Sequence, residues 1–554
     1  MKITRQDYKF KEPRICHIYP KRTELDRLLV NLYMLLKYGG RVPVSRTGRR
    51  EVTIDWIVEE LIHQHSDTLQ GFADNADLIA DWLYSDLIDV INKGNPDKEK
   101  VAAPLPLHLN VYKLRNPKQT NRFGGDEQLY SMMQAGDPDY LVNRLASFLG
   151  QGMETNLDTY DEETPLDLDT LVIVRMVDNE KLKEGHSSRG NTLEPPLCKG
   201  QARLLCDDLQ RLLVYENHVP RSVLITYIRT IMGLHLGLYL LRLFHQLTGW
   251  MYQKQANPAC LECPVEPARQ ENPFHKCPYA MQSDSPANTA LPEILIDMGD
   301  DHTSHMARLS QENCARHYAS MNEYIRTVFA INQLFQFAES QTGRRELNHQ
   351  PNSVADVLKV LASPPPGFDY YFDNRIGNLF PDESNEEESP EIIAIRDMEN
   401  LSPMDTFVEL VALKRTDYYR RHLTQQLDSL FMKNSESCLI VQGKGKNNQR
   451  RWYISSHLLE VLVQIAVLDI TSKNGKKAFY SRPILIDEFV TWLKDRYGFT
   501  IVPNWPDASI KDYEAFNTNM RHLKDRLREI GFYTDLSDAY NAQKIRPRYE
   551  IKRS

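Results

Sequence analysis

Hydrophobic residues recur at helical spacing through much of the N-terminal half of the chain. The first clear run ends before Gly39 and Gly40, and its apolar positions fall mostly three or four residues apart: Leu25, Leu28, Leu29, Leu32, Leu35 and Leu36. Such a stripe predicts an amphipathic helix, and glycine ends a helix readily because it has no Cβ. Similar runs predict helices over 54–62, 75–91 and 204–213.

The most apolar segment runs from Arg221 to Tyr252 in the middle of the chain. It approaches the roughly 20 residues that span a bilayer, but His235, Arg242 and His245 interrupt it. A charge at the bilayer centre costs about 2.5–3.5 kcal/mol. We therefore expect a buried central helix and no contact with a membrane. A short strand in LPEILIDMG and a helix over 311–340 are predicted next.

The C-terminal pattern is different, because alternating apolar residues flank the basic stretch KGKNNQRR. That alternation predicts a β-hairpin with a basic tip. Three helical runs follow, and the last has one clean apolar face: Phe516, Met520, Leu523, Leu527 and Ile530. Residues 532–551 have the pattern of a second hairpin. Three helices and a β-hairpin, with a basic last helix, are the layout of a winged helix-turn-helix.

These patterns predict a mainly α protein with a multi-helix body, a Cys-rich metal-loop insert and a C-terminal winged-helix-like α+β domain. The expected boundaries are an N-terminal helical domain over 1–150, a central helical domain over 170–363 with the insert at 256–280, a linker over 364–400 and a basic domain over 401–554. The linker contains PPPG and PDESNEEESPE. Proline runs are stiff and acidic runs repel themselves, as is typical of linkers.

Composition narrows the class of protein. The chain has 554 residues, 41% of them hydrophobic and only 8 of them Cys, which excludes a disulfide scaffold, a wholly disordered chain and a polytopic membrane protein. No apolar run occurs in the first 20 residues, so we expect a cytoplasmic protein.

The formal charge of −8 hides an asymmetry. Residues 401–554 have 25 Lys and Arg against 18 Asp and Glu, whereas residues 1–400 have 42 against 57. A basic end on an acidic body indicates two surfaces with different partners. Solvated surface charge is the alternative.

The basic residues of the C-terminal part are the candidates for contact with DNA. Asn and Arg are the residue types that bind base edges and phosphates. The other side of the last helix carries Asn517, Asn519 and Arg521, followed by Lys524, Arg526 and Arg528. The predicted DNA-binding residues are Lys444, Lys446, Arg450, Arg451, Asn517, Arg521, Lys524, Arg528, Lys544, Arg546 and Arg548. A small interaction domain with solvated charges would show the same pattern.

The sharpest motif is Cys260-Leu-Glu-Cys263, followed after eleven residues by His275-Lys-Cys277. Two Cys in a CxxC turn can bind one metal ion, and a second pair from a proline-rich loop can complete a tetrahedron. We expect a structural zinc site at Cys260, Cys263, His275 and Cys277. Cys198 or Cys206 could replace His275, and four thiolates would also suit an iron–sulfur cluster. Cysteines without a metal are the third interpretation.

An acidic cluster follows the ILI run: Asp297, Asp300, Asp301, His302 and His305. Carboxylates at the end of a strand can hold Mg²⁺ for phosphodiester cleavage, but Gly and Asp are also ordinary turn residues. The motifs GxxxxGK[ST], GxSxG and HExxH are absent from the sequence, so none of these motifs indicates ATP hydrolysis by a P-loop, a nucleophile-elbow hydrolase or a zinc protease. An enzyme is therefore the less favoured interpretation.

The combination of a helical body, a CxxC insert, the segment ILIDMGDD…RLSQENCARHYASMNEYIR and the basic end RHLKDRLREIGF…RPRYEI resembles accessory proteins of bacterial anti-phage defence islands. The nearest are components of methylation-associated defence and phosphorothioation-dependent restriction systems. The resemblance implies partner subunits that supply ATPase, methyltransferase or nuclease activity. It favours a non-catalytic DNA-binding or scaffolding subunit. There are two alternatives. One is a metal-dependent nuclease that uses Asp297, Asp300, Asp301 and His302, and the other is a pure protein–protein adaptor.

Overall fold

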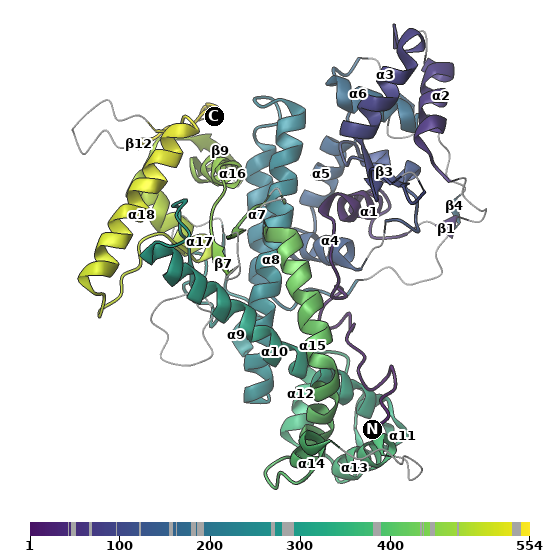
Figure 1. Ribbon diagram of the computed structural model, residues 1–554, viewed down its shortest axis with the longest axis vertical. Coiled ribbons are helices and arrows are strands. Elements are labelled where there is room, and N and C mark those ends of the chain that lie inside the picture. Colours follow the sequence, from purple (N-terminus) through teal and green to yellow (C-terminus); the bar gives the residue numbers. More distant parts are fainter. Residues whose placement is uncertain are drawn as a thin grey trace.

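The structure is a computed structural model, and it is mainly helical, as predicted. It describes residues 1–42, 44–45, 51–65, 69–95, 97–120, 123–154, 159–161, 163–178, 184–185, 193–267, 272–279, 293–380, 389–432, 435, 437–443, 449–473, 476–533 and 544–553. Helix α8 (Arg221–Gln253) runs through the centre. In Figure 1 the elements up to α6 lie on one side of it and α16–α18 on the other.

The N-terminal part is built from short helices and one small sheet. These elements are α1 (Leu25–Lys37), β1 (Val44–Ser45), α2 (Ile54–His65), the 3-10 turn η1 (Ala73–Asn75), α3 (Ala76–Trp82), the π-helical turn η2 (Leu83–Leu87), β2 (Ile88–Ile91), β3 (Lys100–Pro104), the 3-10 helix η3 (Leu109–Leu114), α4 (Gly125–Gly136), α5 (Leu141–Leu149), α6 (Leu168–Val177) and β4 (Glu184–Gly185). The helix predicted over 75–91 is wrong at its end, because Ile88–Ile91 pair with β3 as an antiparallel strand.

The central part contains the longest helices. Its elements are α7 (Lys199–Leu213), α8, α9 (Pro258–Leu261), β5 (Ile294–Leu295), α10 (His305–Glu339), α11 (Gln341–Glu346), α12 (Val354–Ala362), α13 (Phe368–Leu379), α14 (Pro390–Arg396) and α15 (Pro403–Phe431). The predicted helices over 204–213, 221–252 and 311–340 are confirmed as α7, α8 and α10.

Helix α8 is the core helix. Within the described residues it is the one helix long and apolar enough to cross a membrane, yet most of its apolar stretch is buried inside the protein. Its Gly237 allows close packing, because a Cβ there would overlap the ring of Phe431 from α15. The prediction of a buried central helix is therefore confirmed.

The segment 364–400 was expected to be a linker, but its described residues are largely helical and pack on the body. Helices α13 and α14 lie within it. The rings of Phe368 and Phe372 are buried, and Phe368 packs edge-on against Phe337 of α10 with ring centroids 5.0 Å apart. Aromatic burial therefore holds this segment on the body. The acidic run at 381–388 lies outside the described residues.

The C-terminal part combines three helices with short strands: β6 (Ile440–Gln442), β7 (Arg450–Trp452), α16 (Ser456–Ala466), β8 (Leu468–Lys473), β9 (Lys476–Ser481), β10 (Ile484–Leu485), α17 (Ile486–Tyr497), β11 (Phe499–Thr500), α18 (Ile510–Glu529) and β12 (Lys544–Ile545). The hairpin β6–β7 was predicted, whereas β8–β9 was not. Strand β11 pairs in parallel with β5 of the central part.

One large hydrophobic core extends through the described chain, from Phe10 to Ile551. A small separate cluster contains Leu295, Met306 and Phe516. The domain boundaries inferred from composition are not visible as breaks in this core and stay predictions.

Candidate functional site

Helix α18 is the centre of the candidate DNA interface. Ser509 and Asp512 form a capping box at its N-terminus, which satisfies backbone N–H groups that the first turn leaves unpaired. Its inner face buries Phe516, Leu523 and Leu527. The helix is therefore fixed on the protein along one face and open to solvent along the other.

A small sheet lies beside this helix. β10 pairs antiparallel with β12, with Ile484 opposite Ile545. The N–H of Arg546 donates to the carbonyl of Phe532 at 3.1 Å, which joins the segment after α18 to β12. Residues 534–543, which separate Tyr533 from β12 in the sequence, lie outside the described residues.

Several predicted DNA-binding residues are exposed around α18 and β12: Asn517, Arg521, Arg528, Lys544, Arg546 and Arg548, with Lys524 half-buried. Two of the arginines are paired with carboxylates. Arg528 contacts Asp525 at 2.7 Å, and Arg548 contacts Glu460. Arg521 donates to the hydroxyl of Thr518 at 2.9 Å, and in the described part of the chain it forms no ion pair.

The predicted basic hairpin tip contributes less than expected. Lys444 and Lys446 lie outside the described residues. Arg450 makes a two-point ion pair with Asp428, at 2.8 and 2.6 Å. Arg451 does not fit its prediction as a DNA-binding residue, because its side chain is only 2% exposed and cannot reach a phosphate. It points inward to Asp297.

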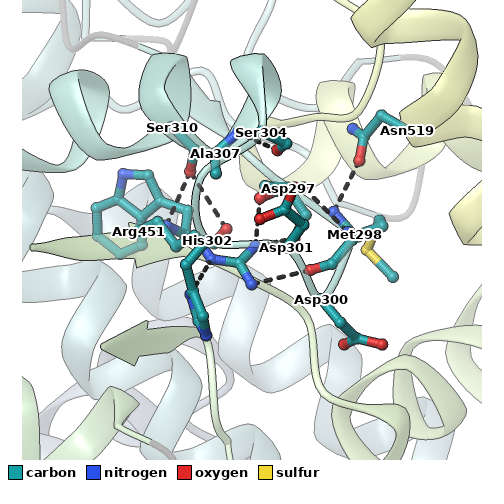
Figure 2. A network of polar contacts seen from close by, with 12 residues as sticks. Asp297, Met298, Asp300, Asp301, His302, Ser304, Ala307, Ser310, Arg451 and Asn519 are labelled. Atoms are coloured by element: carbon teal, nitrogen blue, oxygen red, sulfur yellow. Dashed lines mark hydrogen bonds and ion pairs between the residues drawn. The ribbon is translucent and has the colours of Figure 1, made fainter. Parts of the chain in front are cut away.

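Figure 2 shows this inward-facing arginine in the acidic cluster. Arg451 forms an ion pair with Asp297 and donates to the carbonyl of Gly299 at 2.8 Å and to Nδ1 of His302 at 3.1 Å. Burial raises the pKa of the Asp297 carboxyl, and Arg451 opposes that rise. The guanidinium therefore occupies the place that a metal ion would need beside Asp297.

The other acidic residues of this cluster point elsewhere. Asp300 is exposed and contacts Arg526 of α18 at 2.5 Å. Asp301 accepts hydrogen bonds from the backbone and side chain of Thr303, as in an ordinary turn. His305 contacts Asp512 at 2.6 Å. Within the described residues, no three His, Cys, Asp or Glu side chains come together closely enough to hold a metal ion.

Asn519 is a structural residue that the sequence analysis placed wrongly on the exposed side of α18. It is buried, and its side-chain amide donates to the carbonyls of Ile296 and Ile501 at 2.9 and 2.8 Å. Its oxygen accepts from the N–H of Met298 at 2.7 Å. The signal was in the spacing, because Asn519 lies three residues after Phe516 and four before Leu523, on the buried face.

The cysteine loop brings together a different set of residues from the one predicted. Cys198, Cys260, Cys263 and Cys277 line one cavity of about 20 Å³ together with Arg242. His275 is exposed, and its ring faces the carbonyl of Asn272. His275 does not line this cavity, so the structure does not bring it together with the cysteines.

Cys206, the other thiol considered for this loop, lies elsewhere. It packs against the carbonyls of Met132 and Met133. Of the two substitutes considered for His275, only Cys198 shares the cavity.

Arg242 lies against these cysteines, on α8. Its Nε donates to Gln201 at 2.8 Å, its Nη1 donates to the carbonyl of Tyr279 at 3.2 Å, and its guanidinium lies 4.0 Å from the ring centre of Phe274. Burial lowers the pKa of Arg242, and the neighbouring thiols Cys198, Cys277 and Cys263 oppose that effect. Among the described residues no carboxylate pairs with it.

A second buried network was not predicted from the sequence. Asp208 on α7 accepts from Nε2 of His235 at 2.8 Å, from the hydroxyl of Tyr497 at 2.7 Å and from Nε of Arg496 at 3.0 Å. Arg496 also contacts Asp207 at 2.6 Å. This network fastens α17 of the C-terminal part to α7 and α8.

These features define a mainly helical protein whose body rests on a buried central helix and whose C-terminal part presents a basic helix. The chain belongs to the family described as methylation-associated defense system protein MAD7, whose family model matches residues 5–549. The resemblance to a defence-island component is thus confirmed. No curated protein and no solved structure matches the chain.

Proposed function

We propose that this protein is a non-catalytic DNA-binding and scaffolding subunit of the methylation-associated defence system. It would act in the cytoplasm with partners that supply ATPase, methyltransferase or nuclease activity. Membership of the family supports a role in a multi-component system. The DNA-binding part of the proposal rests on α18.

The observation that carries the proposal is the spacing of polar residues on the solvent side of α18. Asn517, Arg521 and Arg528 are exposed, and they are separated by four and seven residues, which places them on one helical face with Lys524. Lys544 and Arg546 extend this set on β12. An Asn among cations is suited to base edges and phosphates in a major groove.

The arrangement of α16, α17, α18 and the β10–β12 pair supports a winged-helix interpretation. In that layout the last helix before the hairpin is the one that enters the groove. Here α18 precedes the segment from Phe532 to Arg546. Affinity for DNA would come mainly from phosphate contacts and would fall steeply with salt.

The first test is charge reversal on this helix. We expect the triple variant Arg521→Glu, Lys524→Glu, Arg528→Glu to lose retention of a labelled DNA duplex in gel shifts at low salt. If all three side chains contact phosphates, the slope of log affinity against log salt should fall in magnitude by about 3.

A matched control reverses three exposed cations at the other end of the molecule, on α11 and α12 (Figure 1): Arg344, Arg345 and Lys359. This control should bind DNA like the natural protein. Equal binding by both triple variants would refute α18 as the interface. Absence of any DNA binding, with co-purification of system partners, would favour the pure adaptor.

The nuclease alternative has less structural support, because Arg451 neutralises Asp297 and Asp300 points away from it. It makes a clear contrary prediction. Mg²⁺-dependent cleavage of DNA by the purified protein, abolished by Asp300→Ala, would replace our proposal.

A further inference from the structure

The cavity among the cysteines has the size of a single small occupant. It lies where the N-terminus of α7, the short helix α9 and the returning loop meet α8, and its volume is about 20 Å³. A water molecule needs roughly 10–15 Å³ of such volume and at least two polar partners. Arg242 and Gln246 also line this cavity, but its distinctive feature is the four cysteines, and thiolate sulfurs are preferred ligands for a soft or borderline metal ion.

Charge provides the second, independent observation. Arg242 is 2% exposed, and the partners described above for its guanidinium are an amide oxygen, a backbone carbonyl and an aromatic ring. A buried cation is costly unless a negative charge balances it. Among the described residues, the neighbours of Arg242 that can become anionic are Cys198, Cys263 and Cys277.

Other positive groups surround the same loop. Lys199 donates to the carbonyl of Leu261 at 3.0 Å, and Arg203 donates to the carbonyls of Cys263 and Val265 at 2.8 and 3.0 Å. Cys198 is itself the N-cap residue of α7, where the helix dipole favours a negative charge. Burial alone raises the pKa of the Cys198, Cys260 and Cys277 thiols, whereas these positive groups would stabilise a negative charge at the loop.

We propose that Cys198, Cys260, Cys263 and Cys277 bind one zinc ion as four thiolates. Four thiolates and Zn²⁺ carry a net charge of −2, and Arg242 supplies an opposing charge from inside the protein. Each thiol gives up its proton to solvent when the metal binds. The four cysteines line one cavity, but as placed in the structure they are not close enough together to hold a metal ion. The proposal therefore includes a movement of these side chains toward the ion when it binds.

This site explains how a loop with little regular structure is held. Between Pro258 and Tyr279 the one regular element in the described residues is α9, four residues long. A metal ion would cross-link that loop to α7 through Cys198. Four cysteines in a closed site are a ligand set of structural zinc, and analysis of metal and acid-labile sulfide distinguishes zinc from an iron–sulfur cluster.

The experiment measures bound metal by elemental analysis of the full-length protein purified without chelator. We expect one zinc per chain. Cys198→Ser should remove the zinc, and because serine is a good N-cap residue, α7 should be retained by circular dichroism. His275→Ala should keep one zinc per chain, and so should the control Cys206→Ser, which alters a buried cysteine outside the cavity.

A second measurement uses the natural protein and does not require that a cysteine variant folds. Protein produced with Co²⁺ in place of Zn²⁺ should show the visible spectrum of a tetrahedral four-sulfur site, unchanged in His275→Ala. A chain without zinc, iron with acid-labile sulfide in its place, full zinc in Cys198→Ser, or zinc lost from His275→Ala would each overturn the proposal.

Discussion

Arg242 and Arg496 are two fully buried arginines with opposite surroundings. Arg496 lies between the carboxylates of Asp207 and Asp208. Arg242 has neutral partners and cysteines. The first arginine is therefore balanced by carboxylates of the protein itself, whereas the second has no carboxylate partner among the described residues. In our proposal, thiolates bound to a metal ion would balance it. The comparison shows that two arginines buried to a similar extent can have very different charge surroundings, and this difference is what led us to propose a metal site beside Arg242.

The two regions are joined by a chain of hydrogen bonds. Asp208 accepts from Nε2 of His235, and Nδ1 of that ring accepts from the Gln201 amide at 2.7 Å. The oxygen of Gln201 then accepts from Arg242. His235 is fully buried, and burial lowers its pKa, in agreement with a neutral ring that donates once and accepts once. This relay fixes the orientation of both arginines.

The largest effect is expected from Arg496→Met. The change leaves Asp207 and Asp208 buried with less positive charge, and breaking a buried ion pair costs about 3–5 kcal/mol. The urea midpoint of unfolding, followed by tryptophan fluorescence, should fall clearly. The exposed control Arg521→Met should leave it nearly unchanged. Similar midpoints for both variants would show that the Arg496 network is not needed for stability.

Arg242→Met tests the other half of the comparison. If the cysteines hold zinc, loss of this neighbouring cation should weaken metal retention by roughly 10–100-fold, as for other groups just outside a metal's ligands. The measurement is the amount of zinc removed by graded chelator. Without a metal site, removal of an unbalanced buried charge should instead leave stability unchanged or raise it. Easier removal of zinc by chelator therefore indicates a metal site, whereas unchanged or raised stability of a protein without zinc indicates none.

A smaller effect is expected from pH. Burial opposes ionisation of Asp207 and Asp208, but the arginines outweigh it and hold the pKa of each carboxyl below its ordinary value. Such groups stabilise the fold above the unfolded-state pKa of about 4, and that stability is lost as pH falls below it. Asp207→Asn should reduce the slope of the unfolding free energy against pH in the acid range. The reduction is at most about 1.4 kcal/mol per pH unit, which is the contribution of one proton. An unchanged slope between pH 5 and 3 would contradict this assignment.

The sequence predicted elements whose signal is local. The leucine stripes of α1 and α7 and the long apolar run of α8 identify helices, because the pattern that buries them lies within each segment. Prediction from the sequence failed where a segment distant in the chain decides the local structure. Ile88–Ile91 became a strand because β3 pairs with it, and α13 lies on the body because Phe368 meets Phe337.

The candidate sites show the same limit, because residues with a local signal were predicted and residues with distant partners were not. Cys260, Cys263 and Cys277 were found from their spacing, but Cys198 is 62 residues from the nearest of them and could be named only as an alternative. Arg451 was read as a surface cation because it follows a basic loop. Its partner Asp297 lies 154 residues away, beyond any local pattern.

The parallel pairing of β5 with β11 has a consequence for the order of events during synthesis. Ile294 lies opposite Phe499, and Leu295 opposite Thr500. At roughly 5–20 residues per second a ribosome needs on the order of 10–40 s to make the intervening chain. Until then the strand at Ile294–Leu295 lacks its partner, and so does the carbonyl of Ile296 that Asn519 binds. The central part should therefore complete its folding only after the C-terminal part has emerged, which favours assembly with partner subunits after translation over assembly on the nascent chain.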